Sequence, residues 1–331
     1  MKPILSKTKL LALLAVLSGS AVNAGDLPVS PTSGIMQISL PISKTTSLAV
    51  PYAKSIPLEG TITSVSGTTL GLSTAMTDSS LTNHAIYITT KINQSETGAY
   101  GRLVGISSNT TSSVVTASAI TPSVGDAYQI IEQHTLSSLF GQLGTYSLQS
   151  GNSVALSDIV SVEVGGVFTS YWHKTSTGWR LTTDTAGSGA DQANVSINFG
   201  RGVLVARKAF GGAKLLNIKG EAIVGRFQPS VTSNATNLVN NPFLLQTSLG
   251  ASGISDFITK GSTVSLSDTV TLEENGVFTN YWFKNGVGWR LSSDTAGTGA
   301  DQASVLVKAG KAILFRDRLA VGFAIQQPFA N

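Results

Sequence analysis

The sequence predicts an all-β protein: a small N-terminal β-barrel followed by two repeated β-sandwich or meander units with short helical connections. Three observations lead to this prediction. Short runs of alternating apolar and polar residues, split by Gly, Ser and Asn turns, fill most of the chain. Residues 166–193 return at 276–303 with 20 of 28 positions identical. The clearest amphipathic-helix spacing falls in one short stretch near residue 140.

The N-terminus has the features of an export signal. Residues 1–24 combine three lysines with a short apolar run, and Val22 and Ala24 supply small residues at the −3 and −1 positions of a signal-peptidase site. The alternative is an uncleaved N-terminal anchor. No later stretch reaches the roughly 18 apolar residues of a membrane span. We therefore expect a signal peptide cleaved after Ala24, no membrane span afterwards, and a secreted protein in the periplasm or outside the cell.

The amino-acid composition excludes several kinds of function. Of the 331 residues, 12% are charged and 41% are hydrophobic, and none is cysteine. Loss of the leader's three lysines lowers the net charge from +4 to +1, which is no basis for nucleic-acid binding. Such a chain can build a core, yet it has neither disulfides nor thiol chemistry.

The chain divides into five predicted segments. Residues 1–24 are the signal peptide, and residues 25–57 form an extended N-terminal arm in which prolines argue against a central strand. Residues 58–134 hold five short strands and predict the barrel. Repeat unit 1 follows at 135–228 and repeat unit 2 at 229–331.

Two short helices are expected before the repeats. Leu136, Leu139, Phe140 and Leu143 have the i, i+3, i+4, i+7 spacing of a helix, with Thr135 as its N-cap. A second helix with weaker periodicity is expected at 244–250 before the second copy.

The repeated block contains a hairpin with two tryptophans, and all four tryptophans of the chain lie in its two copies. Cross-strand aromatic pairs would stabilise such hairpins, so these side chains are interpreted first as core. The alternative is a carbohydrate-stacking platform of flat rings bordered by arginines. Its candidate ligand-binding residues are Tyr171, Trp172, Trp179, Arg180, Tyr281, Trp282, Trp289 and Arg290.

Catalytic and metal sites are not expected. His173 has Phe283 as its counterpart, so its position accepts an aromatic ring that cannot ionise. No G-x-S-x-G, H-E-x-x-H, P-loop or dinucleotide motif occurs. The Asp-bracketed loops at 184–193 and 294–303 are expected to be turns, with calcium binding through Gly-rich carbonyls as the alternative. No cofactor is predicted. A hydrolase that uses the recurring carboxylates of the two repeats is a third, weaker hypothesis.

A family resemblance rests on four features of the sequence: PSVGDAYQIIEQHTLSSLFG, GRGVLVARKAF, NATNLVNNPF and the aromatic hairpins. Through them the chain resembles an uncharacterised family of secreted proteins found mainly in Verrucomicrobia and related bacteria, and the resemblance covers most of the mature chain. It implies a cellular setting and no catalytic residues.

These observations predict a non-enzymatic exported protein, a structural or assembly component of the cell surface or extracellular matrix. Self-assembly through edge strands and a surface glycan are the partners considered. A secreted carbohydrate-binding module that uses the Tyr/Trp hairpins is the alternative function.

Overall fold

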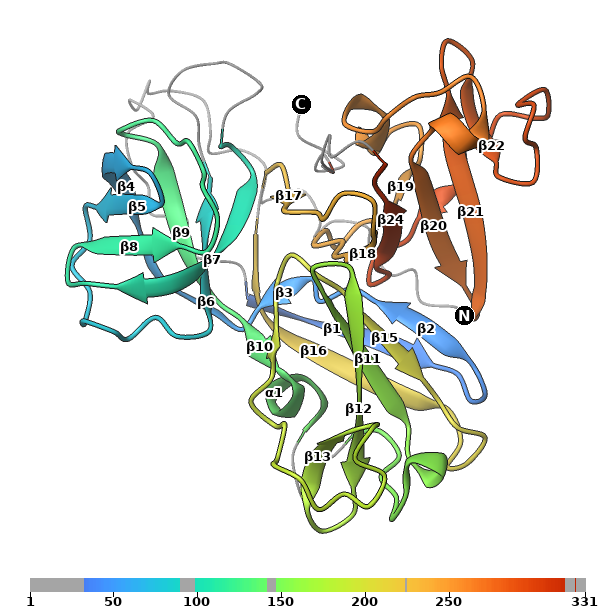
Figure 1. The fold of residues 1–331 in the computed structure, drawn as a ribbon, viewed down its shortest axis with the longest axis horizontal. Coiled ribbons are helices and arrows are strands. Elements are labelled where there is room, and N and C mark those ends of the chain that lie inside the picture. Colours follow the sequence, from blue (N-terminus) through green and yellow to red (C-terminus); the bar gives the residue numbers. More distant parts are fainter. Residues whose placement is uncertain (1–32, 90–98, 142–146, 224, 319–324, 326–331) are drawn as a thin grey trace, which may run out of the picture. The chain divides into compact units, whose positions relative to one another are not determined.

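The computed structural model describes residues 33–89, 99–141, 147–223, 225–318 and 325. The predicted signal peptide, the first part of the predicted arm and Leu143 lie outside these residues. The described chain is nearly all β, as predicted (Figure 1).

The predicted barrel is present and has six strands. In the order β7-β6-β9-β4-β5-β8 each strand pairs with the next, and β7 also pairs with β8, which closes the ring. Its interior is filled by the inward-facing side chains along its strands, among them Ile62, Ile86, Val114 and Ile130. The strands are β4 (Ser55–Ser66), β5 (Thr69–Leu72), β6 (His84–Ile88), β7 (Arg102–Asn109), β8 (Ser113–Thr116) and β9 (Ala127–Glu132).

The two sequence repeats form two five-stranded antiparallel sheets with the same strand order. The first sheet is β13-β12-β11-β15-β2 and the second is β22-β21-β20-β24-β18. The strands of the first are β2 (Thr45–Leu48), β11 (Ile159–Val164), β12 (Val167–Lys174), β13 (Gly178–Leu181) and β15 (Val203–Ala206). Those of the second are β18 (Thr236–Val239), β20 (Thr269–Glu274), β21 (Val277–Lys284), β22 (Gly288–Leu291) and β24 (Ile313–Arg316).

Shorter elements complete the fold. A three-stranded sheet has the order β1-β16-β3, and two pairs of short strands, β10 with β14 and β19 with β23, occupy equivalent places in the repeats. β17 runs parallel to β7. Their bounds are β1 (Ser33–Leu40), β3 (Tyr52–Ala53), β10 (His134–Thr135), β14 (Ser196–Ile197), β16 (Lys214–Ala222), β17 (Gln228–Pro229), β19 (Thr247–Ser248), β23 (Leu306–Val307), α1 (Leu136–Phe140), η1 (Val154–Leu156), η2 (Ile254–Asp256) and η3 (Val264–Leu266).

The described part of the predicted N-terminal arm is paired rather than free. β1 pairs with β16 over eight residues, and β2 is the last strand of the first repeat sheet. Both strands lie at the ends of their sheets, in agreement with the prolines near them, which argue against a central strand. Since β2 precedes the barrel and β11 follows it, the barrel is an insertion between the first strand of repeat 1 and the rest.

One of the two predicted helices is confirmed. α1 begins after Thr135, whose side chain accepts a hydrogen bond from the Ser138 backbone N–H in a capping box. The predicted helix at 244–250 was wrong, because this stretch contains β19 instead. The segment of repeat 2 that corresponds to α1 contains Gly250 and Gly253. Glycine disfavours a helix, which explains why no α-helix forms in that part of the described chain.

The repeats contact each other reciprocally. Ser47 in β2 and Leu238 in β18 occupy the same position in their respective sheets. The Ser47 N–H donates to Oε2 of Glu273 in repeat 2, and the Leu238 N–H donates to Oε2 of Glu163 in repeat 1, both over 3.1 Å. The next pair of contacts is also exchanged: the Ala49 N–H donates to the Gly310 carbonyl over 3.0 Å, and the Asn240 N–H donates to the Gly200 carbonyl over 3.2 Å.

These exchanged contacts are those of an isologous interface, in which each partner presents the same surface to the other. At its centre two equivalent residues meet. A Cβ atom added to Gly202 would lie 2.3 Å from Cβ of Ala312 and 2.9 Å from the carbonyl oxygen of Leu48. The two repeats are therefore packed about an approximate two-fold axis, like the subunits of a homodimer joined in one chain.

The axis gives a stability prediction. Gly202→Ala places two Cβ atoms in one space and is expected to lower the free energy of unfolding by about 1–3 kcal/mol, the usual cost of overpacking. Ala312→Gly in the same chain frees that space and should restore part of the loss. Chemical denaturation of the single and the double variant measures how much of the lost free energy of unfolding Ala312→Gly restores.

Gly105→Ala is the matched control, because the nearest atom to its added Cβ is 3.9 Å away. It should be tolerated. If Gly202→Ala were as stable as Gly105→Ala, or if Ala312→Gly gave no rescue, the close approach of the repeats at this point would be wrong.

Candidate functional site

The eight residues proposed from sequence as a ligand platform are all buried. The four tryptophan side chains are at most 1% exposed, and the two tyrosines and two arginines are 6–7% exposed. Sugar stacking requires an open ring face, so the platform interpretation was wrong for these residues. The aromatic hairpins belong to the core.

Both faces of the aromatic strand are covered, and this explains the burial. Tyr171 points into the apolar cluster of repeat 1, together with residues of β1 and β16. Trp172, on the opposite face, lies under the loop 184–193, where a Cβ added to Gly187 would be 3.1 Å from the indole ring. Gly187 has φ 65°, so glycine is favoured there for its backbone as well as its size.

The indole N–H groups hold the hairpins to neighbouring backbone. Trp172 Nε1 donates to the Leu181 carbonyl over 3.0 Å, and Trp282 Nε1 donates to the Leu291 carbonyl over 3.1 Å. Trp179 Nε1 donates to the Gly141 carbonyl, at the end of α1, over 3.1 Å. Trp172, Trp179 and Trp282 thus fix the strands through both packing and hydrogen bonds. Trp289 Nε1 is buried without a hydrogen-bond partner among the described residues, so Trp289 acts through packing.

His173 acts as an aromatic ring. It packs edge-on against Trp179 at 5.6 Å between centroids, and its counterpart Phe283 packs against Trp289 in the same way at 5.4 Å. Burial lowers the pKa of His173, which favours the neutral ring that this contact needs.

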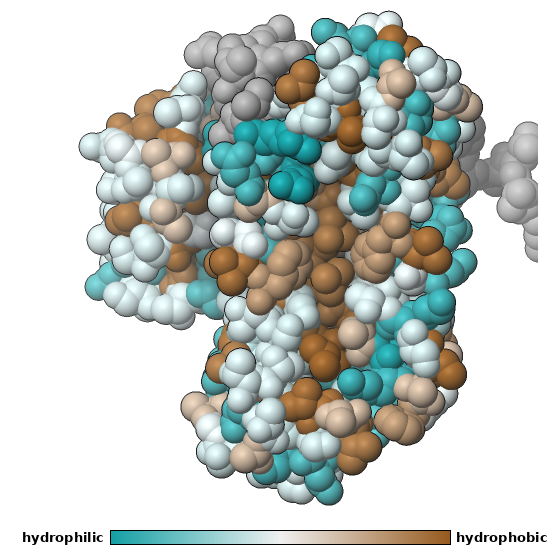
Figure 2. Space-filling view, turned by 45° about the vertical axis from the view of Figure 1, so that its right-hand side comes forward, coloured by the Kyte–Doolittle hydropathy of each residue, from teal (hydrophilic) through white to brown (hydrophobic). Residues whose placement is uncertain are grey.

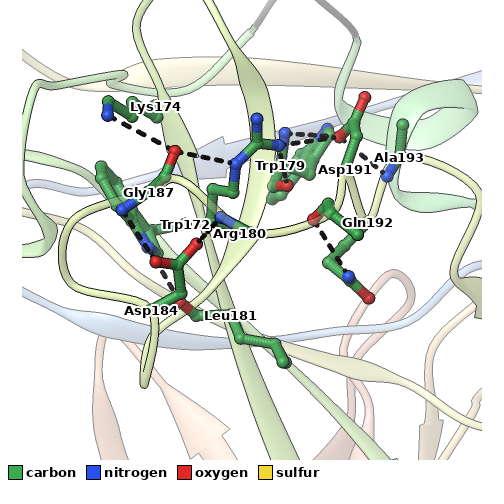
Figure 3. A network of polar contacts seen from close by, with 12 residues as sticks. Trp172, Lys174, Trp179, Arg180, Leu181, Asp184, Gly187, Asp191, Gln192 and Ala193 are labelled. Carbon is green, nitrogen blue, oxygen red and sulfur yellow. Dashed lines mark hydrogen bonds and ion pairs between the residues drawn. The ribbon is translucent and has the colours of Figure 1, made fainter.

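The loop that follows each hairpin is held by a lysine and an arginine that recur in both repeats; Figure 3 shows those of repeat 1. Lys174 Nζ donates to the Ala186 carbonyl over 2.6 Å, and Arg180 Nε donates to the Gly187 carbonyl over 3.1 Å. In repeat 2, Lys284 and Arg290 make the same bonds to the carbonyls of Ala296 and Gly297.

The same loop covers the outer edge of the sheet. The Trp179 N–H, which faces away from β12, donates to Oδ1 of Asp191 over 2.9 Å, and the Trp179 carbonyl accepts from the Gln192 N–H over 3.0 Å. In repeat 2 the Gln302 N–H donates to the Trp289 carbonyl over 3.0 Å. An edge strand with satisfied backbone groups is a poor template for another chain.

The first aspartate of each loop organises backbone N–H groups. The Asp184 carboxylate accepts from the N–H groups of Gly187, Ser188 and Gly189 over 2.9–3.2 Å. These bonds, above all the one from Gly189, lower the pKa of Asp184. Donors directed at a carboxylate form a turn rather than a cage for a cation, and among the described residues no group of three or more His, Asp or Glu side chains could hold a metal ion.

Two buried glutamates, missed by the sequence interpretation, join the repeats. Glu163 pairs with Arg201 at 2.8 Å, and its counterpart Glu273 pairs with Lys311 at 2.6 Å. Each also accepts the exchanged N–H described above. A signal was present in the sequence: an acid recurs at the same position of the repeat, in strands IVSVEV and TVTLEE, next to inward-facing apolar residues. Buried charges are rare unless paired.

A second buried pair breaks the symmetry of the repeats. In repeat 1, Asp158 Oδ2 accepts from Arg207 Nε over 2.6 Å, with both side chains fully buried. In repeat 2 the counterparts are Asp268 and Asp317, both 0% exposed. Burial, with a contribution from the Asp317 charge, raises the pKa of Asp268.

Repeat 2 also has a cleft of about 350 Å³ over its sheet. Its apolar wall includes Leu272, Tyr281 and Val307. The acids at the cleft are paired internally, Glu273 with Lys311 and Glu274 with Lys308. The cleft therefore offers a charged ligand little net attraction.

Comparison with protein-family models, curated proteins and solved structures finds no match to this chain. Among the described residues, none of the helices has the length and apolarity of a membrane-spanning helix.

The Asp268–Asp317 pair predicts an unusual pH dependence. A carboxyl group whose pKa is raised by folding favours the native state below its ordinary pKa, and this contribution is lost as pH rises through the raised value. Asp317→Asn removes the like charge, so it should raise the melting temperature at pH 7 by a few degrees. The gain should shrink as pH falls through the raised pKa of Asp268, because protonation of Asp268 removes one of the two like charges. Calorimetry across this range measures it.

Asp158→Asn in repeat 1 is the matched control. It removes one partner of a buried ion pair and should cost about 3–5 kcal/mol at pH 7. A neutral or destabilising Asp317→Asn at pH 7 would contradict the acid-pair assignment.

Proposed function

We propose that this chain is a non-enzymatic, exported structural or assembly component of the cell surface or extracellular matrix. One observation carries the proposal: the repeated block, which has the residue types of a binding site, uses them within the fold. Its rings are buried, its carboxylates accept backbone N–H groups and its cations donate to backbone carbonyls. A duplicated unit whose polar and aromatic groups make internal contacts has a structural role.

The surface supports a role in contacts with other proteins. Figure 2 shows a band of hydrophobic side chains down the middle of one face, with pale surface of intermediate hydropathy around much of it. Several aliphatic side chains are more than half exposed, among them Ile35, Val164, Val167, Leu215 and Val277. Exposed apolar surface of this kind is suited to protein–protein association.

Export is part of the proposal. The predicted signal peptide at 1–24, the absence of cysteine and the low share of charged residues agree with a protein that works in the periplasm or outside the cell. The resemblance to secreted proteins of Verrucomicrobia and related bacteria points the same way. With the aromatic platform buried, the carbohydrate-binding alternative loses its candidate residues.

The test is the size of the mature protein, residues 25–331, in solution. We expect dimers or larger regular assemblies whose mass rises with concentration, measured by light scattering and imaged in negative stain. A monomer at every concentration would contradict the assembly role, and turnover of a substrate in an activity screen would contradict the non-enzymatic one.

A further inference from the structure

We propose that β1 is the strand through which this chain self-associates, by antiparallel pairing with β1 of a second copy. The inference rests on the proposed assembly function and names the surface that performs it. Five observations about β1 and its neighbours support it.

The first is the position of β1. Among the residues that the structure describes, β1 ends its sheet and has β16 as its one neighbour. The pairing runs from Ser33 opposite Glu221 to Leu40 opposite Lys214 without a register shift. In an antiparallel strand about half of the backbone N–H and C=O groups point away from the neighbour, so one side of a regular eight-residue strand is a template for pairing.

The second is the contrast with the other long sheets. Loops 184–193 and 294–303 cover the outer edges of β13 and β22, as described above. The opposite edges, β2 and β18, face the other repeat, where Ser47 and Leu238 donate to Glu273 and Glu163. The fold thus covers all four edges of the two repeat sheets. Within the described chain, β1 is contacted in this way at its last residue, where Arg207 Nη1 donates to the Leu40 carbonyl over 3.0 Å, and the strand from Ser33 to Ser39 precedes that contact.

The third is the sequence of β1, SGIMQISL. Natural edge strands avoid pairing by carrying Lys, Pro or a β-bulge, and β1 has none of these. In a symmetric antiparallel pair, residues of β1 would lie opposite residues of the same strand. Any charge on β1 would then meet a like charge close by, and an uncharged strand avoids this repulsion.

The fourth is the face that β1 and β16 present to solvent. Ile35 is 63% exposed on β1, and Leu215 is 56% exposed on β16. Between them Gln37 Nε2 donates to Oδ1 of Asn217 over 3.2 Å. Pairing with a second β1 would place the Ile35 side chains of both copies on one continuous sheet surface and shield part of this apolar area.

The fifth observation indicates which partner would pair with the edge of β1. The contact between the repeats shows that this chain already forms isologous packing around a two-fold axis. A β1–β1 pair is also isologous, and it would join two three-stranded sheets into one sheet with the order β3-β16-β1-β1-β16-β3. A second copy therefore fits the edge better than an unrelated partner, since one uncharged, regular strand serves both sides.

The experiment compares two lysine variants on the same ribbon. Ile35→Lys adds a charge to the edge strand, where the two copies would meet, and is expected to raise the dimer dissociation constant at least tenfold. Leu215→Lys adds the same charge to β16, one strand further from the edge, and should leave association within about threefold of wild type. Light scattering over a concentration series measures both, and circular dichroism confirms that both are folded.

Cross-linking identifies the contact directly. The chain has no cysteine, so Ile35→Cys, Gln37→Cys and Ser39→Cys give single thiols on the exposed face of β1. Opposed antiparallel residues are about 4.5–5.5 Å apart between Cα atoms, within disulfide range. Mild oxidation of these variants, singly and in pairwise mixtures, should yield covalent dimers, while Leu215→Cys should yield none.

The outcomes separate the two proposals. Assemblies that persist in Ile35→Lys, without β1 cross-links, would overturn the β1 edge and leave the assembly function standing. A wild-type protein that is monomeric at every concentration would overturn the assembly function itself. Loss of association in Leu215→Lys to the same degree as in Ile35→Lys would show a face contact rather than strand pairing, and would also overturn the β1 edge.

Discussion

The fold depends on one reciprocal interaction, in which a buried glutamate of each repeat accepts a hydrogen bond from the first strand of the other. Glu163 and Glu273 are at most 3% exposed, and each has a cation of its own repeat beside it. A buried carboxylate without its partners would be costly. Each repeat therefore completes the other's buried site, which makes the pair one structural unit.

Differences between the repeats follow from what is inserted or lost in one of them. The barrel interrupts repeat 1 between β2 and β11, yet the strand order of the sheet is unchanged. In repeat 1, Trp179 Nε1 donates to the Gly141 carbonyl at the end of α1. Among its described residues, repeat 2 has no α-helix at the position equivalent to α1, so Trp289 has no such carbonyl beside it. Repeat 2 also has Asp317 where repeat 1 has Arg207, so a second buried acid takes the place of the cation that pairs with Asp158 in repeat 1. The repeated core tolerates these changes because its packing and exchanged hydrogen bonds remain.

Local patterns in the sequence predicted much of this fold, and the failures were non-local. Alternation and turn glycines predicted the barrel, and the offset of 110 residues predicted two equal sheets. No local pattern shows that β2 returns to pair with β15 after the barrel. Strand alternation puts Tyr171 and Trp172 on opposite faces, and only the loop over Trp172 and the core around Tyr171 bury both. The sequence therefore favoured the core interpretation and left the platform open, while Glu163 and Glu273 recur at the same position of the two repeats.

The most direct test of the central claim is amide hydrogen exchange at Ser47 and Leu238, followed by NMR in the mature wild-type chain and in Glu273→Gln. If the repeats are one unit, both amides exchange slowly and at similar rates, through the same opening of the structure. Of the two exchanged amide contacts, Glu273→Gln weakens the one to Ser47 and leaves the one between Leu238 and Glu163 in place. It should then accelerate exchange at both positions. Acceleration at Ser47 with unchanged protection at Leu238 would mean that the repeats open independently, and would contradict the account.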